Sequence, residues 1–264
     1  MRPNRLRQLL KEGKPTLGTH LICPWPGLVE IVGQSGAFDY IEFVGEYAPW
    51  SLEQMDDWAR AADLFPSMSS MMKVEEQAKG LVATRALDSG IQNLLFTDVR
   101  SAAEVRECVR IVRAETPQAG GTHGAGMRRA VGYVLGGGSQ EWCDAMNDVV
   151  IAVMIEKKGA MEDLEAILAV EGVDMLQFGP TDYSISVGVP GQGRGEPVQA
   201  IQKKMVEMAL KAGKHPRIEI GSYEQAKPWL DMGVRHFCIG WDVGILFGWC
   251  KQQGPAMREL LAKA

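Results

Sequence analysis

The hydrophobic and polar positions of the chain form two alternating kinds of segment. Short runs of consecutive apolar or β-branched residues recur along the sequence, and stretches with helical spacing of apolar residues lie between most of them. Strands are expected at residues 16–22, 40–44, 67–74, 91–99, 149–155, 173–178, 216–220 and 234–239. Helices are expected at residues 27–33, 52–64, 76–89, 102–115, 161–170, 197–212 and 222–232, and from 243 onward. This alternation is typical of a parallel sheet.

Eight strands in a chain of 264 residues favour an α/β fold of the (β/α)8 TIM-barrel type over an open sheet. The apolar runs are continuous, as expected of parallel strands that are covered on both faces. No linker rich in Pro, Gly or Ser divides the chain, so residues 1–264 are expected to form a single domain. In such a barrel the catalytic groups lie on the loops that follow the strands.

Composition narrows the functional classes. The net charge of −5 and the pI near 5.5 provide no basic surface for nucleic acid. No apolar run approaches the ~18 residues expected of a membrane span, and the first residues lack an apolar secretory segment. The five cysteines are widely spaced and contain no CxxC, which argues against a disulfide framework or a zinc site. We expect a soluble, cytoplasmic protein that acts on a small molecule.

Two carboxylates follow apolar runs that are separated by one predicted helix. Glu156 comes directly after residues 149–155, and Asp182 follows residues 173–178 by a few positions. Because parallel strands end at the same edge of the sheet, both side chains are expected at the mouth of the barrel. Oxygen ligands suit a hard divalent cation, so we expect Mg²⁺ or Mn²⁺, with Co²⁺ as a further candidate. The alternative is a structural role in ion pairs at the mouth.

Other strand ends add His20, Tyr47 and Lys73 to the candidate site. Glu42 lies within a strand and is expected to face the interior, where it needs a cation; Lys73 is the nearest candidate.

A metal at this mouth favours a substrate that chelates it, such as a 2-oxo acid. The metal would polarise the keto group, so that a neighbouring C–H or C–C bond breaks to leave a stabilised enolate. The backbone N–H groups of Thr181 and Asp182 are expected to hold the substrate carboxylate. Pro180 has no N–H and cannot take part.

These segments resemble the HpcH/HpaI family of metal-dependent class II aldolases, which cleave or form 4-hydroxy-2-oxo acids with pyruvate as one partner and an aldehyde as the other. The resemblance extends from LGTHL through FDYIEFVGEYAP, LDSGIQNLLF, MIEK and EGVDMLQFGPTDYS to the end of the chain. It implies an enzyme, a carbon–carbon lyase, with a (β/α)8 barrel. It also implies a homo-oligomer, commonly a hexamer, in which the C-terminal helix is exchanged between subunits.

The same resemblance assigns roles to individual residues. Glu156 and Asp182 match the metal ligands, and Gly179 and Thr181 fall in the backbone segment that receives the 2-oxo acid. Asp88, in ALDSG, matches the carboxylate that raises the basicity of the catalytic histidine; otherwise it is an ordinary carboxylate at a helix end.

The chain departs from the family pattern at two places. Tyr47 stands where the family usually has the catalytic histidine, with Val44 in place of its supporting aspartate, as in a subgroup with Tyr at this position. Lys73 is the closest match to an arginine that steadies the enolate. Because the ordinary pKa of tyrosine is about 10, Tyr47 is a poor base, and either metal-bound water or His20 is expected to transfer the proton. Tyr47 as a pocket wall and His20 as a packing residue are the alternatives.

Two rival functions remain open. A Schiff-base lyase would use Lys73 as its nucleophile, and this requires a desolvated lysine with a lowered pKa. A non-catalytic protein that binds 2-oxo acids would explain the absence of the usual histidine.

Overall fold

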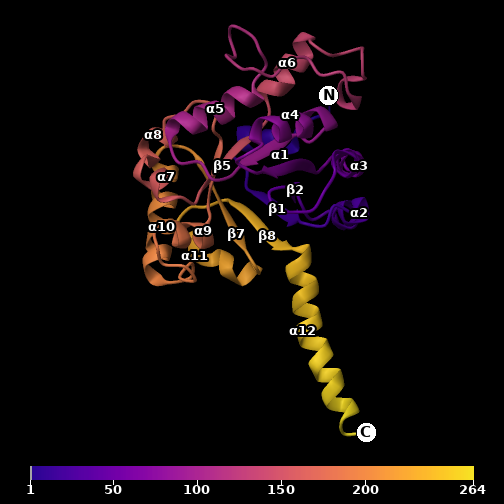
Figure 1. The fold of residues 1–264 in the computed structure, drawn as a ribbon, viewed down its shortest axis with the longest axis vertical. Helices are drawn as coiled ribbons and strands as arrows, with labels where there is room; N and C mark the ends of the chain where they lie inside the picture. The colour runs from indigo at the N-terminus through magenta and orange to yellow at the C-terminus, as the bar shows by residue number, and fades with distance from the viewer. Residues whose placement is uncertain (1) are drawn as a thin grey trace.

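The computed structural model describes residues 2–264 and contains eight parallel strands that close into a barrel (Figure 1). Each strand pairs with its neighbours in sequence, and β8 pairs with β1. The strands are β1 (Thr16–Leu21), β2 (Tyr40–Val44), β3 (Ser69–Val74), β4 (Asn93–Phe96), β5 (Ile151–Ile155), β6 (Met175–Phe178), β7 (His215–Ile220) and β8 (His236–Trp241). The predicted (β/α)8 TIM barrel is confirmed, with a strand inside or overlapping every expected run.

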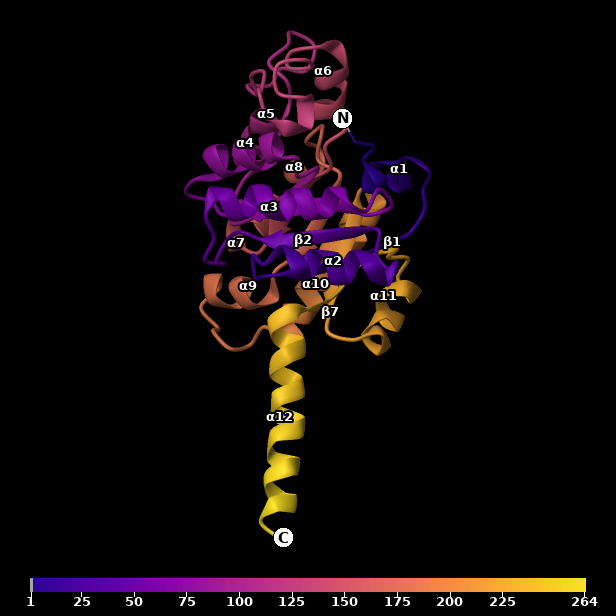
Figure 2. The ribbon, with the colours of Figure 1, turned by 90° about the vertical axis from the view of Figure 1, so that its right-hand side faces the viewer.

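Helices surround the barrel and connect its strands (Figures 1 and 2). The helices are α1 (Arg5–Lys11), α2 (Pro26–Ser35), α3 (Leu52–Asp63), α4 (Lys79–Ser89), α5 (Ala102–Val112), α6 (Gln140–Asn147), α7 (Lys158–Glu162), α8 (Leu164–Leu168), α9 (Pro180–Ser186), α10 (Glu196–Lys211), α11 (Lys227–Asp231) and α12 (Asp242–Leu261). Short 3₁₀ turns occupy η1 (Arg129–Val131) and η2 (Tyr223–Ala226). The sequence pattern did not indicate α1 or α6.

The barrel has two hydrophobic layers. One lies between the strands and the surrounding helices, and the other fills the barrel interior. In the interior, Leu6 and Leu10 of α1 pack with Tyr40, Met71 and Leu95 of the strands. Helix α1 therefore closes the N-terminal end of the barrel and leaves the C-terminal end of the strands as the accessible mouth.

The interior also holds a buried ion pair, which corrects one sequence-based prediction. Glu42 pairs with Arg217 of β7, with 2.6 Å between Oε2 and Nη2, and both side chains are almost fully buried. The predicted partner Lys73 is level with Val44 in the β2–β3 register, one layer nearer the mouth than Glu42, and pairs with Glu46 instead. Arg217 was missed because it lies three strands away around the barrel and 175 residues away along the chain.

Helix α12 projects away from the barrel (Figures 1 and 2). Its start is anchored by Asp242, whose carboxylate accepts the backbone N–H groups of Ile22 and Cys23 at 3.0 and 2.9 Å. Beyond this anchor the helix exposes apolar side chains, including Ile245, Leu246, Phe247 and Trp249. Among the described residues, no helix combines the length and the apolar character needed to cross a membrane.

Candidate active site at the barrel mouth

The C-terminal ends of the strands bring most of the candidate residues to one end of the barrel. Lys73 is the penultimate residue of β3, and Glu156 directly follows β5. Asp182 lies in the first turn of α9, after β6. Tyr47 follows β2 on the adjacent loop. Strands of a parallel barrel all end at the same rim, which is why residues so far apart in sequence converge here.

Glu156 is buried at the centre of this group. Its Oε1 accepts the backbone N–H of Asp98 at 2.9 Å. Gly179 makes room for the other oxygen, because a Cβ at that position would lie 2.3 Å from Oε2 of Glu156. Burial raises the pKa of Glu156 to about 7, against the opposing effects of the Lys73 charge and the Asp98 hydrogen bond. A nearby cation would therefore stabilise the ionised form of this carboxylate.

A lysine bridges two carboxylates beside Glu156. The Nζ of Lys157 lies 2.5 Å from Oδ1 of Asp98 and 3.5 Å from Oδ1 of Asp182. Asp98 has a φ of +58°, in the left-handed region that non-glycine residues seldom adopt. The contacts of its N–H with Glu156 and of its carboxylate with Lys157 maintain this conformation. Asp98 was not among the predicted site residues, although it has the same sequence feature as Glu156 and Asp182: a carboxylate shortly after a buried strand.

The oxygen donors at the mouth fit a hard divalent cation with few protein ligands. Among residues 2–264, no group of three or more His, Cys, Asp and Glu is arranged to hold a metal. Glu156 and Asp182 would therefore supply two ligands and leave the remaining positions to water and substrate, as Mg²⁺ commonly prefers. The negative charge of Asp182 is also felt at Glu156, where it contributes to the raised pKa. Charge repulsion of this kind is relieved by a shared cation.

Lys73 extends into the mouth from β3. Its Nζ lies 2.5 Å from Oε2 of Glu46 and 5.3 Å from the ring centroid of Tyr47. Burial lowers the pKa of Lys73, but the charges of Glu46 and Glu156 outweigh this effect and leave the pKa above its ordinary value. Lys73 is therefore a cation at neutral pH, which suits electrostatic stabilisation and does not suit a neutral amine nucleophile.

Tyr47 covers Lys73 from the outer side of the mouth. Partial burial raises the pKa of its hydroxyl, and the charges of Glu46 and Glu219 add to this effect against the opposing charge of Lys73. The phenol is therefore protonated at neutral pH and can donate a hydrogen bond. This agrees with the expectation that Tyr47 is a poor base.

His20 lies on the part of the rim formed by β1, β7 and β8. Its Nδ1 is 3.6 Å from Sγ of Cys238, and its Nε2 is 3.9 Å from Oε1 of Glu219. The ring meets Trp241 edge-on, with 6.1 Å between centroids. His20 was predicted at this rim, but Glu219 was not. Glu219 lies in the alternating pattern RIEI and does not follow an apolar run.

Asp88 lies far from the other candidate residues, which gather at the mouth of the barrel. It lies in the last turn of α4, just before β4, and therefore at the N-terminal end of the barrel. Its carboxylate lies 3.5 Å from Nε2 of the buried His123 and 3.2 Å from Arg85. It cannot act on a group at the mouth of its own barrel.

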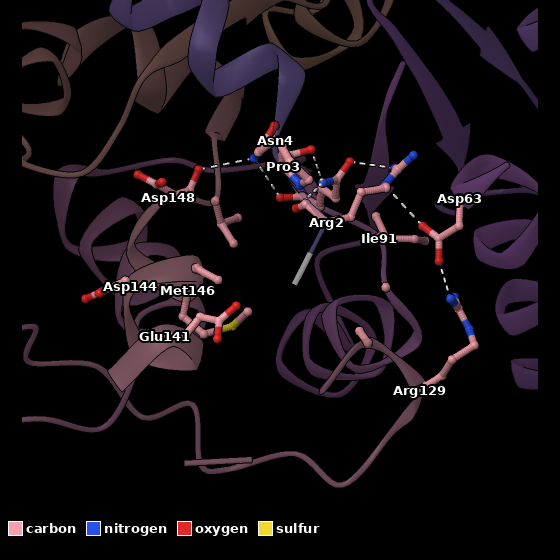
Figure 3. Close-up of a pocket in the computed structure, with 15 residues that line it drawn as sticks. Arg2, Pro3, Asn4, Asp63, Ile91, Arg129, Glu141, Asp144, Met146 and Asp148 are labelled. Atoms are coloured by element: carbon pink, nitrogen blue, oxygen red, sulfur yellow. Dashed lines mark hydrogen bonds and ion pairs between the residues drawn. The ribbon is translucent and has the colours of Figure 1, made fainter. Parts of the chain in front are cut away.

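A cavity of about 380 Å³ lies at the same N-terminal end (Figure 3). Arg2 and Arg129 both pair with Asp63 at its edge, and Arg2 also donates to the backbone carbonyls of residues 62, 65 and 68. These polar groups hold the N-terminal segment against the barrel. In (β/α)8 barrels this end of the strands serves stability and the opposite end carries the chemistry, so we assign the active site to the mouth.

Comparison with known proteins identifies the family that this chain resembles. Residues 26–222 match the family model described as HpcH/HpaI aldolase/citrate lyase. A 4-hydroxy-2-oxo-heptane-1,7-dioate aldolase from Escherichia coli is 30% identical over 249 residues, covering 92% of this chain and 90% of that protein.

Solved structures show the same fold. An HpcH/HpaI aldolase from Desulfitobacterium hafniense superposes with a TM-score of 0.86 at 25% identity, covering 97% of this chain and 98% of that one. A family protein from Burkholderia cenocepacia superposes with a TM-score of 0.87 at 24% identity, covering 97% of this chain and 100% of that one.

Proposed function

Because the chain belongs to the HpcH/HpaI aldolase/citrate lyase family, we propose that it cleaves and forms 4-hydroxy-2-oxo acids at the barrel mouth, with pyruvate or a similar 2-oxo acid as one product. The chain is thus an enzyme of the aldolase and lyase class. The observation that carries the proposal is the pair Glu156 and Asp182 at adjacent strand ends, with the protonated Lys73 extending toward Glu156.

The family depends on a divalent metal, and we propose Mg²⁺ or Mn²⁺, with Co²⁺ as a third candidate, held by Glu156 and Asp182. Such an ion would polarise the keto group of the bound 2-oxo acid. The backbone N–H groups of Thr181 and Asp182 would receive the substrate carboxylate, because the first N–H groups of a helix have no intrahelical partner and α9 begins at Pro180. Gly179 would line this segment without donating, because its N–H is bonded to the backbone carbonyl of Ile155 at 3.2 Å.

We assign Lys73 to stabilising the negative charge that develops on the 2-oxo acid when the carbon–carbon bond breaks. Its raised pKa disfavours the rival Schiff-base mechanism, which needs a neutral amine. Treating the enzyme with borohydride in the presence of pyruvate should therefore leave its mass unchanged. A covalent adduct on Lys73 would favour the Schiff-base lyase.

The proton-transfer group remains a choice between His20 and water. Tyr47 is held protonated, so its most direct role is to donate a hydrogen bond or to shape the pocket. Asp88 would act only if the N-terminal end of a neighbouring barrel met the mouth of this one.

The proposed function is tested by measuring pyruvate release from a panel of 4-hydroxy-2-oxo acids. Activity should be present with Mg²⁺ or Mn²⁺, fall to background in EDTA, and return when the metal is restored. Release that is indifferent to EDTA would contradict the metal mechanism. Metal-dependent binding of pyruvate without turnover of any substrate would instead favour the non-catalytic binder.

We further propose that α12 packs on a second copy of the chain in a homo-oligomer, with a hexamer as the expected assembly. The exposed apolar side chains of this helix, including Phe247 and Trp249, would be unfavourable on a free surface. Analytical ultracentrifugation at micromolar concentration should show an oligomer, and replacing Phe247 and Trp249 with Ser should shift it toward monomer. A monomer of the unmodified chain under these conditions would contradict the exchanged helix.

A further inference from the structure

The part of the mouth formed by β7, β8 and β1, next to the end of β6 that leads to Asp182, carries a carboxylate that the reaction as described does not use. Glu219 lies on β7 two residues after Arg217, so the two side chains share the interior face of the strand. Arg217 is fully buried among the interior groups, whereas the side chain of Glu219 is 47% exposed. Glu219 is therefore one layer nearer to the opening, on the same rim as His20 and Trp241.

A chain of buried polar groups fixes the position of Glu219. Glu42 pairs with Arg217, and Arg217 donates to Oε1 of Gln177. The guanidinium can only donate hydrogen bonds, so the side chain of Gln177 must present its oxygen to Arg217 and its amide nitrogen to the other side. That nitrogen donates to Oε2 of Glu219 at 3.0 Å. The carboxylate is thus held in one orientation before any substrate arrives.

The second oxygen of Glu219 remains available to a ligand. Among residues 2–264, the nearest charged or chargeable nitrogen to Oε1 is Nε2 of His20 at 3.9 Å, beyond hydrogen-bond distance. The side chain of Trp241, 40% exposed, lies beside His20 and adds an apolar surface to this part of the rim. An oriented carboxylate beside an aromatic ring suits a ligand that has both hydroxyl donors and C–H groups.

The cations at the mouth do not offset this charge. Lys73 is paired with Glu46, and Lys157 is paired with Asp98 and lies near Asp182. A substrate with a second carboxylate would meet the free oxygen of Glu219 on a rim where Lys73 and Lys157 are already paired with carboxylates. Like charges brought together in this way disfavour binding.

We propose that Glu219 recognises the aldehyde partner of the reaction and selects a neutral hydroxyaldehyde over an aldehyde that carries a carboxylate. This inference rests on the proposed function, because it assigns the 2-oxo acid to the metal side of the mouth and the aldehyde to the Glu219 side. The Escherichia coli relative is named for a dioate substrate, so the proposed preference would be a difference between the two enzymes.

The test measures aldol addition of pyruvate to three aldehydes: glyceraldehyde, succinic semialdehyde and propanal. The unmodified enzyme should have a higher kcat/KM for glyceraldehyde than for succinic semialdehyde. Glu219→Gln keeps the shape of the side chain and removes its charge. In this variant the kcat/KM for glyceraldehyde divided by that for succinic semialdehyde should fall by about 10-fold or more, as expected when a hydrogen bond to a charged group is lost. Propanal, with neither a hydroxyl group nor a charge, should react equally well with both enzymes.

Two controls separate the possible failures. Glu224→Gln removes an exposed carboxylate from the turn after β7 and should leave all three values unchanged. Exchange of the methyl protons of pyruvate with D₂O, followed by NMR, needs no aldehyde and should be equal in the unmodified enzyme and in Glu219→Gln.

If exchange is normal but the aldehyde ratio does not change in Glu219→Gln, the inference is overturned. An equal loss with all three aldehydes overturns it as well, because it would indicate a structural role. If the unmodified enzyme, loaded with metal, neither exchanges pyruvate protons nor releases pyruvate, the proposed function fails and the inference fails with it.

Discussion

Replacing Glu156 with Gln should abolish divalent-ion binding while leaving the barrel folded. Gln keeps the size of the side chain and an oxygen that can accept the N–H of Asp98, but it removes the negative charge. Changing a residue that only supports a metal ligand typically weakens affinity 10- to 100-fold, so loss of a ligand itself should cost at least about 100-fold. Calorimetric titration with Mn²⁺ measures this change, and pyruvate release should fall to the level seen in EDTA.

Thermal unfolding provides a readout that does not depend on activity. Mn²⁺ at 100 times its Kd should raise the free energy of unfolding of the unmodified chain by about 2.7 kcal/mol. It should not stabilise Glu156→Gln or Asp182→Asn to a comparable extent. Glu165→Gln, on an exposed position of α8, is the matched control and should bind Mn²⁺ normally. Unchanged Mn²⁺ affinity in either ligand variant would show that the site is wrongly assigned.

The strands were predictable because a parallel barrel buries both faces of its strands, and such strands appear in the sequence as continuous apolar runs. The exact residues at which the strands begin and end were less predictable. The run 91–99 is longer than β4 because Ile91 and Val99 are buried outside the strand. Helix α1 was missed because it has only seven residues, although its buried residues Leu6, Leu9 and Leu10 follow the i, i+3, i+4 spacing of a helix.

The position of Glu156 and Asp182, the proposed metal ligands, was predictable from a single rule, that carboxylates after buried strands meet at the barrel mouth. Glu156 and Asp182 follow this rule, and the same rule applied to the segment after β4 would have identified Asp98. The family resemblance added roles that the residues alone leave open. Its match for Asp88 illustrates the limit, because a matching position does not place a side chain at the mouth of its own barrel.

Contacts across the barrel were not predictable. Glu42 was expected to pair with Lys73 on the adjacent strand, but the barrel brings it to Arg217 instead. The register that decides this pairing depends on how all eight strands close, which no local pattern specifies. For the same reason the Gln177 bond that positions Glu219 emerged only from the structure.

Replacing Lys73 with Ala should lower turnover by about 10²- to 10³-fold, the usual cost of removing one group that stabilises a developing negative charge. The barrel should stay folded, because Lys73 lies at the mouth and not among the interior apolar side chains. Lys73→Arg should retain part of the activity, since it keeps the charge while changing the hydrogen-bond geometry. Steady-state kinetics with a confirmed 4-hydroxy-2-oxo acid substrate measures the effect.

Variants at Tyr47 and His20 then identify the group that transfers the proton. Because the pKa of Tyr47 is held above its ordinary value, Tyr47→Phe should keep most of the activity. His20→Ala should reduce turnover severely if His20 is the base, and only slightly if water is. An inactive Tyr47→Phe beside a normal His20→Ala would instead require the phenol in proton transfer. Full activity in these variants and in Lys73→Ala would mean that the active site lies elsewhere.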